Sequence, residues 1–137
     1  MEYLGSGDPA RNLTDYYPTW LDKLAEDVTV EGSAMDGVAQ GAEAVRTILV
    51  SIRSQYESQQ FNFVGPVGEN GLLEDYTAQV RGEPISCFVL VTSNPAGQAQ
   101  HIVANYRPRS SLLLLSRLVG EKLAGTPYGK HFAASES

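Results

Sequence analysis

Hydrophobic residues in this chain recur with two spacings, which separate a helical segment from a stranded one. From Ala42 the apolar residues follow each other at steps of three and four, which predicts an amphipathic helix over residues 42–57. The segments after it are short, apolar and bounded by turn residues, and their connections are too short for crossover helices. They predict an antiparallel meander of four strands, over residues 61–64, 72–81, 85–92 and 99–107.

Helix and strand signals also precede the long helix. Asp8 followed by Pro9 predicts a short helix over residues 9–16, because Asp caps free amide groups and Pro is tolerated at the first helical position. Trp20, Leu21 and Leu24 share helical spacing and predict a second short helix over residues 18–25. The β-branched residues at 28–31 then predict a first short strand.

A leucine-rich segment follows the last predicted strand. Ser110 or Ser111 can cap a helix that continues to about Ala124 and ends at Gly125. Its apolar side is broader than one stripe, so we expect it to pack on the sheet and to be available to a partner subunit as well. Residues 126–137 are expected to form a flexible tail.

The composition indicates one globular domain over residues 1–137, with a core over about 9–125. The chain has 137 residues, of which 42% are hydrophobic and 19% charged. Its net charge of −6 argues against binding to nucleic acid or to anionic lipid. The N-terminal residues show no secretion signal and the leucine-rich segment is too short to span a bilayer, so we expect a cytoplasmic protein that does not bind membranes.

Motifs for metals and cofactors are absent from the sequence. Cys87 is the only cysteine, which excludes a disulfide within the chain and a metal site built from several cysteines. The sequence contains no phosphate-binding glycine loop before a lysine, no spacing typical of metal ligands and no Gly-x-Ser-x-Gly motif. We therefore expect no cofactor and no metal.

Two stretches of the chain resemble the nuclear transport factor 2-like (SnoaL-like) superfamily, and within it the ketosteroid isomerase branch. The first runs from Ala25 to Glu31 and resumes after a glycine-rich loop with Gly41-Ala42-Glu43-Ala44-Val45-Arg46. The second comprises Pro84-Ile85-Ser86-Cys87-Phe88 and the Ala96-Gly97 hairpin. The resemblance implies an α+β, cystatin-like fold in which a curved antiparallel sheet, one short strand plus the meander, wraps round helices to form a cone with an apolar pocket.

The isomerase chemistry of that branch is not matched by this chain. At the position of the general-base aspartate the chain has Gly32, and at the position of the aspartic acid that donates to the enolate oxygen it has Ser86. Tyr16 or Tyr17 lies near the position of the donor tyrosine. The Arg-x-Asp motif of the epoxide hydrolase branch is absent from the predicted strands.

Two other acidic residues are candidates for acid or base catalysis. Period-two alternation places Glu74 on the inward face with Tyr76, where loss of solvation would raise its pKa. Asp36 lies in the loop close to the missing base. Each also has a structural explanation, Glu74 as an edge residue and Asp36 as a turn former.

The remaining candidates are expected to bind a ligand or a second subunit. Those that would line the pocket are Tyr16, Trp20, Met35, Tyr56, Tyr76, Ser86, Phe88, Ile102 and Tyr106. Matching the last strand to the family places His101, Val103, Asn105 and Arg107 on the outer face, which relatives often use to form homodimers.

Three functions remain open. The first is a homodimeric domain that binds a small apolar molecule. The second is a cofactor-independent isomerase, hydratase or cyclase that uses Glu74 or Asp36. The third is a module that binds protein or dimerises through a sheet face or the leucine-rich helix.

Overall fold

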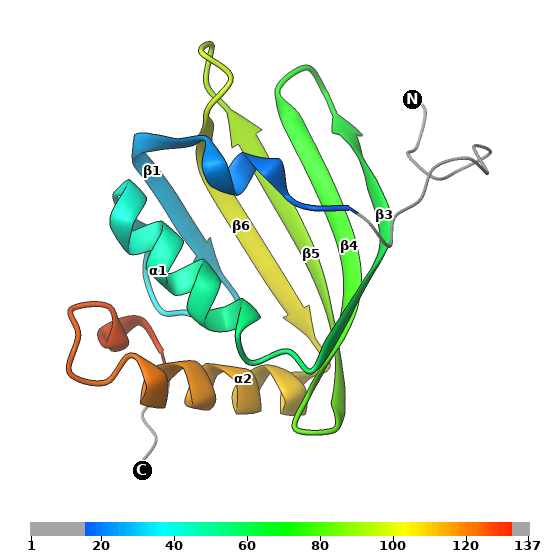
Figure 1. The fold of residues 1–137 in the computed structure, drawn as a ribbon, viewed down its shortest axis with the longest axis vertical. Coiled ribbons are helices and arrows are strands. Elements are labelled where there is room, and N and C mark those ends of the chain that lie inside the picture. Colours follow the sequence, from blue (N-terminus) through cyan, green and yellow to red (C-terminus); the bar gives the residue numbers. More distant parts are fainter. Residues whose placement is uncertain (1–15, 133–137) are drawn as a thin grey trace.

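The computed structural model describes residues 16–132, so the predicted helix over residues 9–16 lies outside the described residues except for Tyr16 (Figure 1). The strands are β1 (Leu24–Gly32), β2 (Ala39–Gln40), β3 (Ser58–Val67), β4 (Gly71–Val80), β5 (Glu83–Ser93) and β6 (Ala99–Arg107). The helices are α1 (Ala42–Arg53) and α2 (Arg109–Lys122), with two short 3₁₀ helices, η2 (Thr19–Asp22) and η3 (Gly129–His131).

The strands form one six-stranded sheet in the order β2-β1-β6-β5-β4-β3. The meander from β3 to β6 is antiparallel, as the sequence predicts. Strand β1, however, pairs with β6 in parallel, so the sheet is mixed and the prediction of a fully antiparallel sheet is wrong at this pair. Strand β2 pairs with β1 in antiparallel orientation at one edge of the sheet, and α1 then connects β2 to β3 at the opposite edge.

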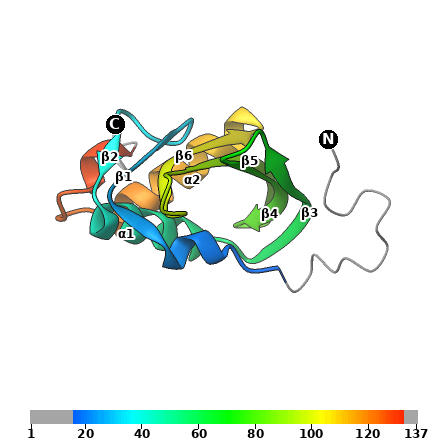
Figure 2. The ribbon, with the colours of Figure 1, turned by 90° about the horizontal axis from the view of Figure 1, so that it is seen from above.

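The sheet curls around one face, and Figure 2 shows the arc from β1 to β3 with α1 on its open side. Irregular registers in the β3–β4 pair between Phe61 and Phe63, and in the β5–β6 pair between Thr92 and Ser93, mark places where strands bend. The buried face of α1 carries Val45, Ile48 and Ile52 into the arc. The α+β architecture with a curved sheet round a helix is therefore as predicted.

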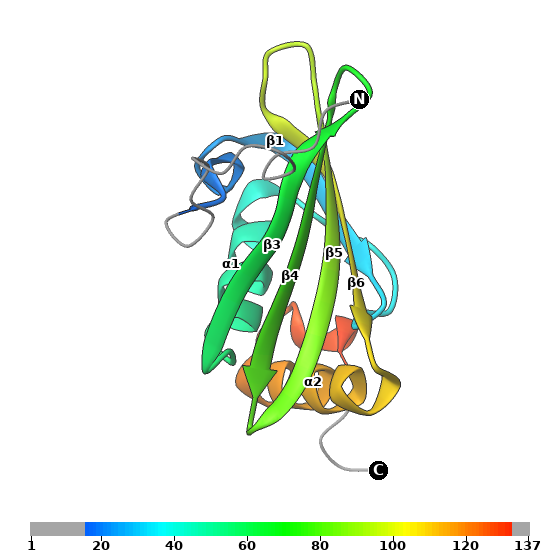
Figure 3. The same ribbon diagram turned by 90° about the vertical axis from the view of Figure 1, so that its right-hand side faces the viewer.

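Helix α2 crosses the lower end of the sheet, near the β4–β5 turn (Figures 1 and 3). It buries Leu115, Leu118 and Val119 and leaves Leu113 52% exposed. The predicted serine cap is wrong: the helix begins after Pro108 without a side-chain cap, and the hydroxyl of Ser111 donates instead to the carbonyl of Pro84 at 2.7 Å. This hydrogen bond ties α2 to the sheet.

Three predicted segments differ from the structure. Residues 18–25 contain only the 3₁₀ helix η2 before β1 starts at Leu24, and α1 ends at Arg53, earlier than predicted. The prediction of a flexible tail is wrong as far as Phe132, because η3 returns the chain to the domain and Phe132 is buried in the core. The C-terminal segment therefore contributes to packing.

Candidate functional site

Glu74 is the one acidic or basic side chain that is buried within the described residues, at 2% exposure. It lies in the middle of β4, with Val64 and Val89 opposite it on the neighbouring strands. Alternation along β4 places it on the concave face with Tyr76, because side chains two residues apart share a face. The alternative that Glu74 is a solvated edge residue is thus inconsistent with its position.

The segment of residues 16–22, which we call the strap, covers Glu74. The hydroxyl of Tyr16 donates to Glu74 Oε2, and the indole Nε1 of Trp20 donates to the same oxygen at 2.8 Å. Trp20 is the only tryptophan of the chain. Figure 2 shows the strap beside α1 on the open side of the arc.

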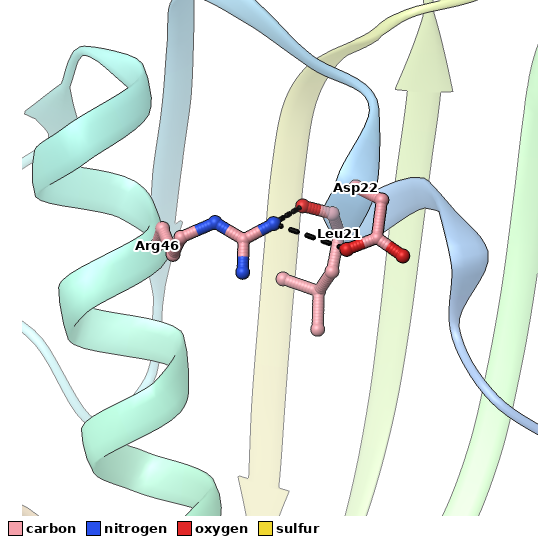
Figure 4. Close-up of polar contacts among 3 residues, drawn as sticks. All are labelled: Leu21, Asp22 and Arg46. Carbon is pink, nitrogen blue, oxygen red and sulfur yellow. Dashed lines mark hydrogen bonds and ion pairs between the residues drawn. The ribbon is translucent and has the colours of Figure 1, made fainter.

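Arg46 of α1 fixes the strap from the helix side. Its Nη2 donates to the backbone carbonyl of Leu21 and contacts Asp22 Oδ1 at 3.2 Å (Figure 4). Both ends of the ion pair with Asp22 are largely exposed, so the carbonyl contact is the more specific of the two. The 3₁₀ turn is thereby held over the sheet with Leu21 buried beneath it.

Burial controls the protonation of Glu74. Loss of solvation raises the pKa of its carboxyl, and the hydrogen bonds from Tyr16 and Trp20 and the charge of Arg53 oppose that rise without cancelling it. The pKa of Tyr16 is also raised, first by burial and then by the negative charge of Glu74. A carboxyl with a raised pKa next to a protonated hydroxyl is a candidate for both accepting and releasing a proton.

Three tyrosine hydroxyls meet on the concave face near Glu74. Tyr56, from the turn after α1, contacts the hydroxyl of Tyr76 on β4 at 2.6 Å and that of Tyr106 on β6 at 3.3 Å. Burial is the first cause that raises the pKa of each of the three hydroxyls. All three therefore stay protonated and act as hydrogen-bond donors as well as acceptors.

Cys87 belongs to the same cluster. It faces Tyr76 across one strand pair and Tyr106 across the other, and it is fully buried. Burial raises the pKa of its thiol to about 12, against hydrogen bonds from both tyrosines that lower it. The thiol is thus a neutral, poorly nucleophilic group.

A cavity lies beside Glu74 and is bounded by the sheet, α1 and the strap. Its open volume is about 50 Å³, which is room for a few water molecules and well below that of pockets for drug-sized ligands. Its walls are mostly apolar, with Glu74, the tyrosine hydroxyls, Gln59 and Arg53 as polar groups. The lining residues are Pro18, Trp20, Leu21, Leu49, Ile52, Arg53, Tyr56, Gln59, Phe61, Glu74, Tyr76, Val89, Ala104 and Tyr106.

The structure brings some of the predicted site residues together and separates others. Trp20, Tyr56, Tyr76 and Tyr106 line the cavity with Glu74, and Tyr16 reaches Glu74 from the strap. Ile102 is buried on the same face of the sheet but does not line this cavity.

Ser86 and Phe88 lie on the opposite, convex face, because their neighbours Ile85, Cys87 and Val89 occupy the buried positions of β5. Phe88 is 45% exposed and lies under the guanidinium of Arg107 at 4.5 Å. The prediction that both residues line the pocket is wrong. The inward residue at this level of the strand is Cys87.

Asp36 and Met35 line a different pocket from Glu74. That pocket lies between the β1–β2 loop and α2 and has a volume of about 160 Å³. Asp36 is exposed, and its backbone amide and carbonyl bind the carbonyl and Nδ1 of His131 at 2.7 and 2.9 Å. Asp36 and Glu74 therefore do not form one site.

Gly32 lies where no side chain fits. A Cβ built there would stand 1.9 Å from the carbonyl oxygen of Ala104 on the paired strand β6. The position that the family resemblance assigns to a general base is thus closed to any carboxylate with this packing of β1 on β6.

His101 lies on the convex face, as predicted. Its Nδ1 contacts Thr29 Oγ1 at 2.5 Å and its Nε2 contacts Glu31 Oε2 at 3.1 Å, both from β1. These contacts join β6 to β1 across the parallel strand pair. His101 does not line the cavity that contains Glu74.

Groups of His, Cys, Asp and Glu side chains that could hold a metal ion are not found among residues 16–132. The helices in that range are all too short or too polar to cross a membrane.

Comparison with solved structures identifies the fold. A protein with a cystatin-like fold from Silicibacter pomeroyi gives a TM-score of 0.72 at 17% identity, over 77% of this chain and 74% of that one. A steroid delta-isomerase from Pseudomonas aeruginosa gives 0.72 at 18% identity, over 78% and 79%. A nuclear transport factor 2-like protein of unknown function from Burkholderia xenovorans gives 0.55 at 12% identity, over 66% and 73%.

The chain has the nuclear transport factor 2-like, cystatin-like fold. No protein-family model matches its sequence, and comparison with curated proteins gives no match. At these identities the likeness concerns the nuclear transport factor 2-like fold and not an activity.

Sequence reasoning missed four residues that shape the site: Arg46, Arg53, Phe61 and Cys87. Phe61 packs its ring against Tyr76 at 5.2 Å, but alternation from Val64 would place it on the opposite face, because the bulge between Phe61 and Phe63 is not visible in the sequence pattern. The two arginines lie two turns apart on α1, beside its apolar stripe. The pattern of the sequence predicts that charged side chains at such positions are exposed to solvent and have no role in a site. Their roles depend on where the strap lies.

Proposed function

We propose that this domain binds a small, largely apolar molecule in the cavity between α1, the strap and the sheet. The observation that carries the proposal is the pairing of apolar walls with a few polar groups: Glu74 and the Tyr76 hydroxyl on β4, and the hydroxyls of Tyr56 and Tyr106 from elsewhere in the fold. A ligand of more than a few heavy atoms requires the strap to move outward, because the open volume is about 50 Å³.

The fluorescence of Trp20 provides the test. As the only tryptophan, bonded to Glu74 at the cavity wall, it should change its emission when a ligand enters. Titration with a panel of small ketones, alcohols and aromatic compounds should give at least one saturable response. Ala104→Leu would fill the cavity and should abolish it, whereas Phe88→Leu on the convex face should not. Responses absent from the whole panel, or unchanged by Ala104→Leu, would contradict binding in this cavity.

A second proposal is that Glu74 transfers a proton on the bound molecule. The buried carboxyl, whose pKa is raised, faces protonated tyrosine hydroxyls across the cavity. If Tyr56, which donates to Tyr106 at 3.3 Å, instead donates a hydrogen bond to a ligand carbonyl oxygen, the negative charge that develops on that oxygen is stabilised. Glu74 can then take a proton from the adjacent carbon and return it to the same or a neighbouring carbon, without a cofactor.

Isotope exchange tests this step without knowledge of the substrate. In deuterated water, ketones from the panel that bind should exchange the hydrogens next to their carbonyl group, as followed by NMR. We expect Glu74→Gln to lower the exchange rate by about 10²-fold or more. Glu69→Gln, in the exposed turn between β3 and β4, removes the same charge away from the cavity and should not change the rate. Equal rates in Glu74→Gln and the native chain would exclude Glu74 as the base.

We also propose that the convex face of the sheet forms a homodimer. Leu73, Leu90 and Val103 lie side by side on β4, β5 and β6. Next to them lie the stacked pair Phe88 and Arg107. We expect sedimentation to show a dimer that Leu90→Asp converts to a monomer, while Leu113→Asp on α2 leaves it intact. A native chain that sediments as a monomer would refute this assignment.

A further inference from the structure

One cation lines the cavity that holds Glu74. Arg53 is the last residue of α1, and its side chain both lines the cavity and is exposed to solvent. Its charge reaches into the cavity, since it lowers the pKa of the Glu74 carboxyl against the effect of burial. The cavity therefore has a buried carboxyl group on one wall and a solvent-exposed cation on another.

The guanidinium of Arg53 is not neutralised by another residue in the described part of the chain. It lies over the ring of Tyr17 at 5.5 Å and forms no ion pair within residues 16–132. The charged side chains next to it have other partners: Glu57 accepts from the amide of Gly82 at 2.9 Å, and Lys122 donates to Ser54 at 2.6 Å. The cation–π contact with Tyr17 leaves the N–H donors of Arg53 available.

We infer that the ligand of this cavity carries a carboxylate, which Arg53 binds. The inference rests on the proposed function and narrows it to small organic acids with an apolar body. The apolar body lies against Leu49, Ile52 and Phe61, and the far end reaches the tyrosine hydroxyls. A planar guanidinium and a planar carboxylate form paired N–H···O bonds, which fix the direction in which the molecule enters.

Matched pairs of acids and amides test the inference. Carboxylates with short alkyl chains, and phenylpropanoate, are titrated against the corresponding amides while Trp20 fluorescence is recorded at neutral pH. Acid and amide have the same size and differ in charge, so their ratio of dissociation constants isolates the contribution of Arg53. We expect the acids to bind about tenfold more tightly. The ratio should fall as salt is added, because exposed charges are screened.

Substitutions test whether Arg53 is responsible for the preference for acids over amides. Arg53→Gln should bring the ratio of the dissociation constants to about one, and Arg53→Lys should keep part of the preference as a point charge without the planar fork. Arg117→Gln, on an exposed face of α2, removes one positive charge away from the cavity and should keep the full preference. Circular dichroism of each variant checks that the fold is retained.

The outcomes separate this inference from the proposed function. If acids and amides bind equally well, or if the preference for acids survives in Arg53→Gln, the assignment of Arg53 is overturned and the cavity remains a binding site for neutral molecules. If no member of either series binds and no compound of the neutral panel does, the binding cavity itself is refuted. A salt dependence that is the same for acids and amides would also count against Arg53.

Discussion

Replacement of Glu74 by glutamine should change the pH dependence of stability in a defined direction. The folded chain keeps the Glu74 carboxyl at a raised pKa because burial removes its solvation, while in the unfolded chain the group returns to its ordinary value of 4.5. Above pH 4.5 the unfolded chain releases this proton first, so the folded chain holds one more proton. Stability is therefore lost as pH rises from 4.5 to the folded pKa.

The size of the effect follows from one titrating group. Across that window the free energy of unfolding falls by up to about 1.4 kcal/mol per pH unit, and above the folded pKa the loss is complete. A glutamine side chain does not titrate, so the Glu74→Gln variant is spared this loss. At the acid end both side chains are neutral, and the amide should cost roughly 1–3 kcal/mol because one of its buried N–H groups gains no acceptor.

Urea unfolding of both proteins, from mildly acidic to mildly alkaline pH, measures the effect. The stability of Glu74→Gln minus that of the native chain should be negative at the acid end and rise with pH. Other titrating groups cancel in this difference, and Glu69→Gln gives the baseline for losing one negative charge. A difference that stays flat or falls with rising pH would refute the claim that burial outweighs the hydrogen bonds from Tyr16 and Trp20.

Three further substitutions test the packing. Gly32→Ala should prevent the β1–β6 pairing near Ala104. We expect the free energy of unfolding, measured in urea, to fall by about 3 kcal/mol or more, as for severe overpacking. Leu115→Ala should cost roughly 2–5 kcal/mol in the same assay, since this side chain is fully buried, and a cost under about 1 kcal/mol would contradict its burial. Arg46→Gln should loosen the strap, so acrylamide should quench Trp20 fluorescence more strongly while stability changes little. Unchanged quenching would argue against the role of Arg46 in holding the strap.

The order of the elements could be predicted from the sequence because each depends on local signals. The steps of three and four in α1, and the turn residues between strands, gave positions within a few residues of those observed. The parallel pairing of β1 with β6 has no such signal, since it depends on where distant segments meet. The burial of Phe132 escaped prediction for the same reason.

The candidate site was only partly predictable. Alternation along β4 places Glu74 inward, and no other information is needed. On β5 the family resemblance favoured Ser86, whereas the alternation of Ile85, Cys87 and Val89 places the serine outside. The position of Asp36 was not predictable from its place in the sequence. Its proximity to Gly32 suggested that it lies in the same pocket as the other site residues, yet the loop turns toward α2.

The parallel contact of β1 with β6 has a consequence for how the protein folds. Strands β3 to β6 are consecutive and can assemble by short hairpins, whereas β1 must find a strand at the far end of the chain. We therefore expect β1 to dock late. The aromatic residues just before it, which reach Glu74, then arrive last, and until they do the carboxyl is open to water and free to ionise.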